Sequence, residues 1–172
     1  MITRERLKGA YSEGEALAIY KEVKPEGDFI GFCSKYMYDE DSLVVRNALW
    51  GLTKAGNSEI RELQPLKDSL ITLAMTTDNS SIRRLSLNLV ERMKMEKDEV
   101  RTDFLDFCME HMVDVREYPG IQSLCMKLAF RMCAFFQELA GEMFRIVSTM
   151  EMEYYSPAVR SVRNRILKGK MK

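Results

Sequence analysis

Four stretches of the sequence repeat one helical pattern at intervals of 37, 39 and 38 residues. They begin at residues 41, 78, 117 and 155 and read DSLVVRNALWGLTKAGN, DNSSIRRLSLNLVERMK, EYPGIQSLCMKLAFRMC and YSPAVRSVRNRILKGKM. Counted from the first residue as zero, positions 4, 7 and 11 are apolar in every stretch. These twelve residues are Val45, Ala48, Leu52, Ile82, Leu85, Leu89, Ile121, Leu124, Leu128, Val159, Val162 and Ile166. Spacings of three, four and seven residues fall on one face of an α-helix, so each stretch is predicted to be an amphipathic helix.

The segments between these helices predict the partner of each one. A period of about 38 residues has room for two helices and their turns. Periodic apolar residues predict one helix in each of the ranges 27–38, 63–75, 100–113 and 138–150. Strand-like alternation is absent from the sequence, so the chain is predicted to be all-α.

The starts of several helices carry capping signals. Three of the repeated stretches open with such signals: polar residues from Asp78 to Ser81, the pair Tyr118 and Pro119, and the pair Ser156 and Pro157. A further helix over 12–24 begins with Ser12 and Glu15 at capping-box spacing and ends at Pro25. With a shorter helix over 3–10, it is expected to form an N-terminal cap.

The turn before the repeated helix resembles that of a HEAT repeat. It has an Asp, then a Val-Arg or Ile-Arg step, then an apolar residue three positions after the Val or Ile. Asp41 with Val45-Arg46 and Asp78 with Ile82-Arg83 match this pattern best. In the third stretch the polar positions hold Glu117 and Gln122, and in the fourth they hold Tyr155 and Arg160.

The resemblance implies an α-α superhelix of the ARM/HEAT type in a single domain over 1–172. About four helix pairs are expected at 26–57, 58–95, 96–134 and 135–172, after an N-terminal cap over 1–25. The whole chain also resembles small bacterial HEAT-like proteins, some of which carry an adenylosuccinate lyase label. Lyases of that superfamily are much longer bundles with a flexible serine loop, and no stretch of this sequence resembles that loop.

Several classes of function are disfavoured by what the sequence lacks. No apolar run approaches the roughly 18 residues of a membrane span, and the first residues lack a secretory core, so a cytoplasmic protein with no membrane contact is expected. Cys33, Cys108, Cys125 and Cys133 show no CxxC spacing, and His111 is the only histidine, so reduced thiols and no metal are expected. No P-loop, dinucleotide fingerprint, HExxH or GxSxG occurs, so we expect no cofactor and favour a non-enzymatic protein.

Charge is distributed unevenly along the repeats although the formal net charge is zero. The four second-helix regions (41–56, 79–95, 118–134 and 156–172) carry +12 together, and the four first-helix regions carry −13. In stacked helical repeats the second helices usually line the concave face, where partners bind. This distribution predicts a basic concave face for an acidic protein or peptide partner. Alternatively, Arg46, Arg83 and Arg160 bond the turn Asp of a neighbouring repeat, and the last helix is a solvated cap.

A helix turns 100° per residue, so positions 6, 9, 10 and 13 of each stretch are predicted to point away from the core. The predicted partner-binding residues are Trp50, Lys54, Arg84, Met126, Lys127, Phe130, Arg165 and Lys168. Their apolar members could instead pack between adjacent helices. Nucleic acid is the alternative partner, by resemblance to HEAT-like alkylpurine DNA glycosylases. A sequence pI near 6.6 weighs against it, because phosphate binding depends on many basic contacts.

Overall fold

The computed structural model describes residues 1–171, and within that range the chain forms eleven α-helices and four short 3₁₀ helices, with no strand. The all-α prediction is confirmed. The helices belong to two compact units, Met1–Lys94 and Met95–Lys172. The boundary falls next to the predicted junction between the second and third repeats.

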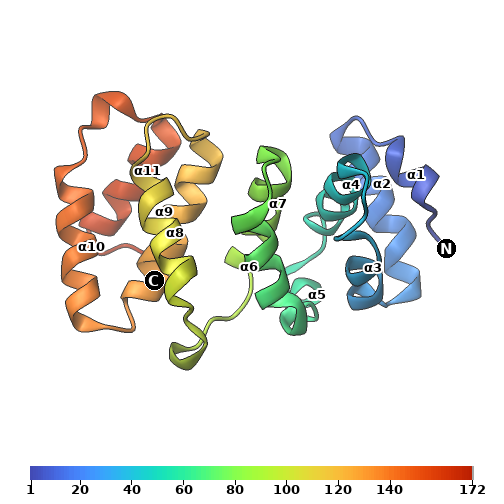
Figure 1. Cartoon of the computed structure of the whole chain (residues 1–172), viewed down its shortest axis with the longest axis horizontal. Helices are drawn as coiled ribbons and strands as arrows, with labels where there is room; N and C mark the ends of the chain where they lie inside the picture. Colours follow the sequence, from blue (N-terminus) through green and yellow to red (C-terminus); the bar gives the residue numbers. More distant parts are fainter. Residues whose placement is uncertain (172) are drawn as a thin grey trace. The chain divides into compact units, whose positions relative to one another are not determined.

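The first unit is organised around α4 (Figure 1). Its elements are α1 (Arg4–Lys8), α2 (Glu13–Val23), η1 (Lys24–Glu26), α3 (Phe29–Tyr36), α4 (Ser42–Leu52), α5 (Asn57–Arg61), η2 (Gln64–Leu66), α6 (Lys67–Thr76) and α7 (Ser80–Glu91). Helix α4 packs against α1, α2, α3 and α7, and α7 packs in turn against α6. The second helices of the first two repeats, α4 and α7, are therefore direct neighbours.

The second unit is organised around α9, which contacts all three other α-helices of the unit. Its elements are η3 (Lys97–Glu99), α8 (Thr102–Val113), α9 (Pro119–Cys133), α10 (Gln137–Thr149), η4 (Met152–Tyr154) and α11 (Pro157–Leu167). Figure 1 shows α8 and α9 side by side as an antiparallel pair. Within this unit too, the second helices α9 and α11 pack directly on each other.

The cores of both units are built from the repeated apolar positions. All twelve predicted residues are buried, and none is more than 9% exposed. Burying a Val, Leu or Ile side chain contributes about 1.5–3 kcal/mol relative to leaving it exposed. The pattern that predicts the helices is thus also the one that holds each unit together.

Side chains cap helices at the predicted positions, and Asp41 in the turn before α4 does so as well. Asp41 accepts a hydrogen bond from the Leu43 amide at 2.9 Å, and Asn79 accepts one from the Ile82 amide at 3.0 Å. Ser156 and Ser12 do the same for α11 and α2. These side chains bind amides that have no partner inside the helix, which fixes where each helix starts.

The repeat arginines bind backbone carbonyl oxygens at the ends of neighbouring helices. The Arg83 Nε donates to the Ala74 carbonyl at the end of α6, at 2.8 Å. Arg46 donates to the Ala10 carbonyl beyond α1, at 3.2 Å. Arg160 is exposed, and its side chain has no hydrogen bond within residues 1–171, so the expectation that it bonds a turn Asp is wrong. In α11 the Arg163 Nε makes the equivalent bond, to the Val147 carbonyl of α10 at 3.0 Å.

Gly51 allows α2 and α4 to approach closely. A Cβ atom at this position would lie 2.5 Å from Cγ2 and 3.1 Å from Cβ of Ile19, a fully buried side chain of α2. Both Ile19 atoms belong to a stiff β-branched centre, which cannot move aside as the end of a flexible side chain can. The glycine is therefore required by packing.

Gly51→Ala is expected to lower the free energy of unfolding by about 1 kcal/mol, because overpacking of about 1–3 kcal/mol exceeds the gain of up to about 1 kcal/mol in helix propensity. Urea unfolding followed by circular dichroism measures the change. Gly141→Ala in α10 is the matched control, because nothing lies within 4 Å of an added Cβ there and helix propensity alone should raise the stability. A stabilised Gly51→Ala variant would show that the α2–α4 contact is looser than described.

Candidate functional site

One exposed stripe of α11 carries Arg160, Arg165 and the C-cap residue Lys168. Together with Lys170, which follows the turn at the end of α11, these residues line a shallow hollow of about 460 Å³. Its lining residues, which we call the α11 surface, are Pro157, Arg160, Ser161, Asn164, Arg165, Lys168 and Lys170. Spacings of three and four residues place the helical members on one face.

The turn that ends α11 adds Lys170 to this surface. Gly169 has φ of 67°, a left-handed conformation that suits glycine. The Gly169 amide donates to the Ile166 carbonyl at 3.1 Å, and the Lys170 amide donates to the Arg165 carbonyl at 2.8 Å. This pair of bonds is a Schellman motif, which folds the chain back over the end of the helix.

The cations of the α11 surface are not neutralised locally. The side chains of Arg160, Arg165, Lys168 and Lys170 are exposed and have neither a hydrogen bond nor an ion pair within residues 1–171. The helix macrodipole favours cations near the last turn, which accounts in part for Arg165, Lys168 and Lys170. It does not account for Arg160, which lies in the first turns of α11. The surface as a whole is suited to hold an anion.

Three predicted residues of the first unit meet in a second pocket. Trp50 and Lys54 come from α4 and Arg84 comes from α7, and they share a hollow of about 250 Å³. This hollow, which we call the Trp50 pocket, is lined by Glu13, Trp50, Thr53, Lys54, Arg84, Leu85, Asn88 and Arg92. The α4–α7 and α2–α4 contacts position these side chains.

Glu13 of α2 occupies the Trp50 pocket with its carboxylate. The Trp50 Nε1 donates to Glu13 Oε1 at 3.3 Å, and the Lys54 ammonium forms an ion pair with Oε2. Lys54 lowers the pKa of Glu13, with smaller contributions from the Trp50 hydrogen bond and from Arg84. The Arg46 guanidinium lies over the indole ring, 5.7 Å from its centroid. The pocket thus presents an aromatic ring and cations to a carboxylate.

The predicted residues of α9 do not form a comparable site. Met126 is fully buried, so its prediction as an exposed partner contact is wrong. Leu87 of α7, which was expected to face away from the core in the same register, is also fully buried. Helix α9 is surrounded by α8, α10 and α11, and α7 lies between α4 and α6, so more than one face of each helix is covered. Lys127 and Phe130 are partly exposed.

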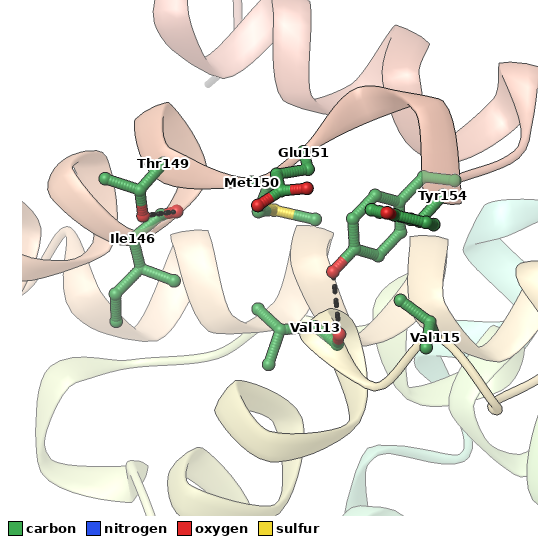
Figure 2. Close-up of a pocket in the computed structure, with 8 residues that line it drawn as sticks. Val113, Val115, Ile146, Thr149, Met150, Glu151 and Tyr154 are labelled. Carbon is green, nitrogen blue, oxygen red and sulfur yellow. Dashed lines mark hydrogen bonds between the residues drawn. The ribbon is translucent and has the colours of Figure 1, made fainter.

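An apolar hollow of about 580 Å³ lies between the ends of α8 and α10 (Figure 2). Val113 and Val115 line it from one side, and Ile146 and Met150 line it from the other. The Tyr155 hydroxyl donates to the Val113 carbonyl at 2.7 Å, and burial, with smaller contributions from Asp114 and Glu151, raises the pKa of this tyrosine. This hollow was not predicted, because the first helices differ from the second most clearly in their acidic charge, whereas the hollow is lined by apolar residues at helix ends.

The four cysteines are buried, and none of them forms a disulfide. Burial raises the pKa of Cys33 to about 12 and that of Cys133 to about 11. Such thiols remain protonated at neutral pH and are poor nucleophiles and ligands. Within residues 1–171, no group of three or more His, Cys, Asp or Glu is placed to hold a metal ion.

Comparison with known protein families identifies the repeat. A family model described as a HEAT repeat domain matches residues 3–170. The chain belongs to the HEAT-repeat family. No curated protein and no solved structure matches it, so the resemblance to proteins with an adenylosuccinate lyase label has no support.

HEAT repeats generally act as protein-interaction scaffolds. In this HEAT-repeat chain both hollows that contain predicted residues involve second helices, α4 and α7 in one unit and α11 in the other.

In the part of the chain that the structure describes, no helix has the length and apolar character needed to cross a membrane. Two residues that line these hollows, Glu13 and Lys170, were not among the predicted residues. Glu13 precedes the repeated stretches, and Lys170 reaches the α11 surface only through the turn at Gly169.

Proposed function

We propose that this HEAT-repeat protein is a non-enzymatic scaffold that binds an acidic protein or peptide through basic side chains of its second helices. The observation that carries the proposal is the α11 surface, where four cations surround one hollow and have no carboxylate partner within residues 1–171. Unpaired surface cations attract an anionic partner and raise its association rate. Partly exposed Phe130 and Trp50 supply apolar contacts of the kind found at binding hot spots.

An acidic protein accounts for the second helices better than nucleic acid does. In the first unit the basic side chains of the Trp50 pocket already bind a carboxylate, that of Glu13. A protein partner presents the same chemical group. Tight binding of nucleic acid instead needs many cations along one surface. The formal net charge of this chain is zero, which weighs against such binding.

The double variant Arg165→Glu and Lys168→Glu is expected to reduce capture of acidic proteins from native lysate by about tenfold or more, because it replaces attraction by repulsion. Both side chains are exposed, so the fold and its unfolding midpoint should not change. The matched control is Lys21→Glu with Arg61→Glu, which changes the net charge equally at exposed positions outside the second helices. Mass spectrometry quantifies the captured proteins.

Two outcomes would overturn the proposal. The first is equal capture by both double variants, which would mean that the α11 surface is not used. The second is loss of capture after nuclease treatment of the lysate, which would assign the surface to nucleic acid. A duplex should also lose affinity steeply and log-linearly with salt, whereas a peptide held in part by apolar contact with Phe130 should keep part of its affinity.

A further inference from the structure

The Trp50 pocket binds an acidic side chain of its own chain, and this contact indicates what else it can bind. Glu13 contributes the only carboxylate among the lining residues, which also include the cations of Lys54, Arg84 and Arg92. One carboxylate does not neutralise three cations, so the pocket remains net positive with Glu13 in place. A second acidic group is therefore attracted to the same place.

One wall of the pocket is held by hydrogen bonds, whereas Glu13 is exposed. Arg92 donates to the Thr53 carbonyl at 2.8 Å and also to the Ala55 carbonyl and the Asn57 side chain, which fixes one wall. The Glu13 side chain is 73% exposed and lies in the first turn of α2. Exposed ion pairs are weak, so another carboxylate can displace Glu13 at little cost while the pocket keeps its shape.

A further group in the pocket lacks a partner. The Asn88 Oδ1 is buried and accepts no hydrogen bond within residues 1–171, although Asn88 lines the Trp50 pocket. Buried acceptors without a donor are uncommon, because the group loses its bond to water. A peptide offers an amide N–H beside its acidic side chain, which can satisfy this oxygen once the Asn88 side chain turns toward the pocket. A phosphate diester has no donor of its own.

We propose that the Trp50 pocket is a binding site for an Asp or Glu side chain of an acidic peptide, and that Glu13 occupies it as an internal competitor until such a peptide displaces it. The proposal rests on the proposed function and names a site for the same class of partner. In the unbound protein Glu13 reduces the apparent affinity, because only molecules with Glu13 displaced are able to bind. Removing its charge should therefore tighten binding.

Trp50 is the only tryptophan in the chain, so its fluorescence reports on the pocket directly. The probe is a hexaglutamate peptide with blocked ends, and blocked hexaglutamine is the neutral comparison. Hexaglutamate should change the Trp50 emission and hexaglutamine should not. The Glu13→Gln variant should bind hexaglutamate about two- to fivefold more tightly than the wild type, as expected for loss of an exposed competing pair.

Glu62→Gln is the matched control, since Glu62 is exposed, lies in the same unit and does not line the pocket. Lys54→Met should weaken hexaglutamate binding. An unchanged Trp50 emission, equal affinities of the Glu13→Gln and Glu62→Gln variants, or a stronger response to duplex DNA than to hexaglutamate would each overturn the proposal.

The two proposals fail in different ways. Loss of lysate capture by the α11 double variant, with no effect of Glu13→Gln on hexaglutamate binding, rejects the Trp50 pocket alone. Tighter binding by Glu13→Gln, with undiminished capture by the α11 double variant, rejects the α11 surface alone.

Discussion

Leu89→Ala in the first unit and Leu128→Ala in the second are each expected to lower the free energy of unfolding by about 2–5 kcal/mol. Both side chains are fully buried, and each belongs to the repeated apolar pattern. The loss combines the transfer free energy of the deleted methyl groups with the cost of the cavity. Leu128 should lie toward the upper end of the range, because α9 is held by three other helices that cannot easily close on the cavity.

Urea unfolding measures these changes with two signals. Trp50 fluorescence follows the first unit, in which it lies, and circular dichroism follows the helices of both units. Leu17→Ala is the control, because Leu17 of α2 is 40% exposed and its truncation should change stability by about 0.5 kcal/mol or less. Unchanged midpoints for both buried leucines would show that the assigned core face is wrong.

Asn47→Leu is expected to lower the free energy of unfolding by about 1–3 kcal/mol, because it removes two hydrogen bonds of a buried side chain, each of which contributes about 0.5–1.5 kcal/mol. Asn47 is fully buried in α4. Its Nδ2 donates to the Leu7 carbonyl at 2.6 Å, and its Oδ1 accepts from the Arg46 Nε at 3.0 Å. Leucine fills a similar volume but can make neither bond, so the effect isolates polar pairing from packing.

Chemical denaturation of the Asn47→Leu variant gives the magnitude, and Asn164→Leu, at an exposed position of α11, is the control. If both leucine variants are as stable as the wild type, the contact between α1 and α4 does not depend on the buried amide. A loss confined to Asn47→Leu would establish that α1 is held to α4 by this side chain.

The helices and their buried faces could be predicted because both depend on spacing within one stretch. Leu52, Leu89, Leu128 and Ile166 all occupy the same predicted position and are all buried. Periodicity also places Arg160, Arg165 and Lys168 on one stripe of α11.

The burial of Met126 could not be predicted in the same way. One stretch shows which face of a helix is apolar, but it does not show how many neighbours cover the other faces. Glu13 was missed for a related reason. It lies 37 residues before Trp50, and its position in the pocket depends on how α2 packs on α4, which no local pattern encodes.

The bonds from second-helix side chains to first-helix carbonyls have a consequence for folding kinetics. Arg83 reaches back 9 residues to Ala74, Gln122 reaches back 8 residues to Asp114, and Arg163 reaches back 16 residues to Val147. Loop-closure entropy rises with loop length, so contacts over such short separations form at low cost. Chains whose contacts are mostly local fold rapidly, and the hairpin of two helices is thus the expected nucleus from which each unit grows.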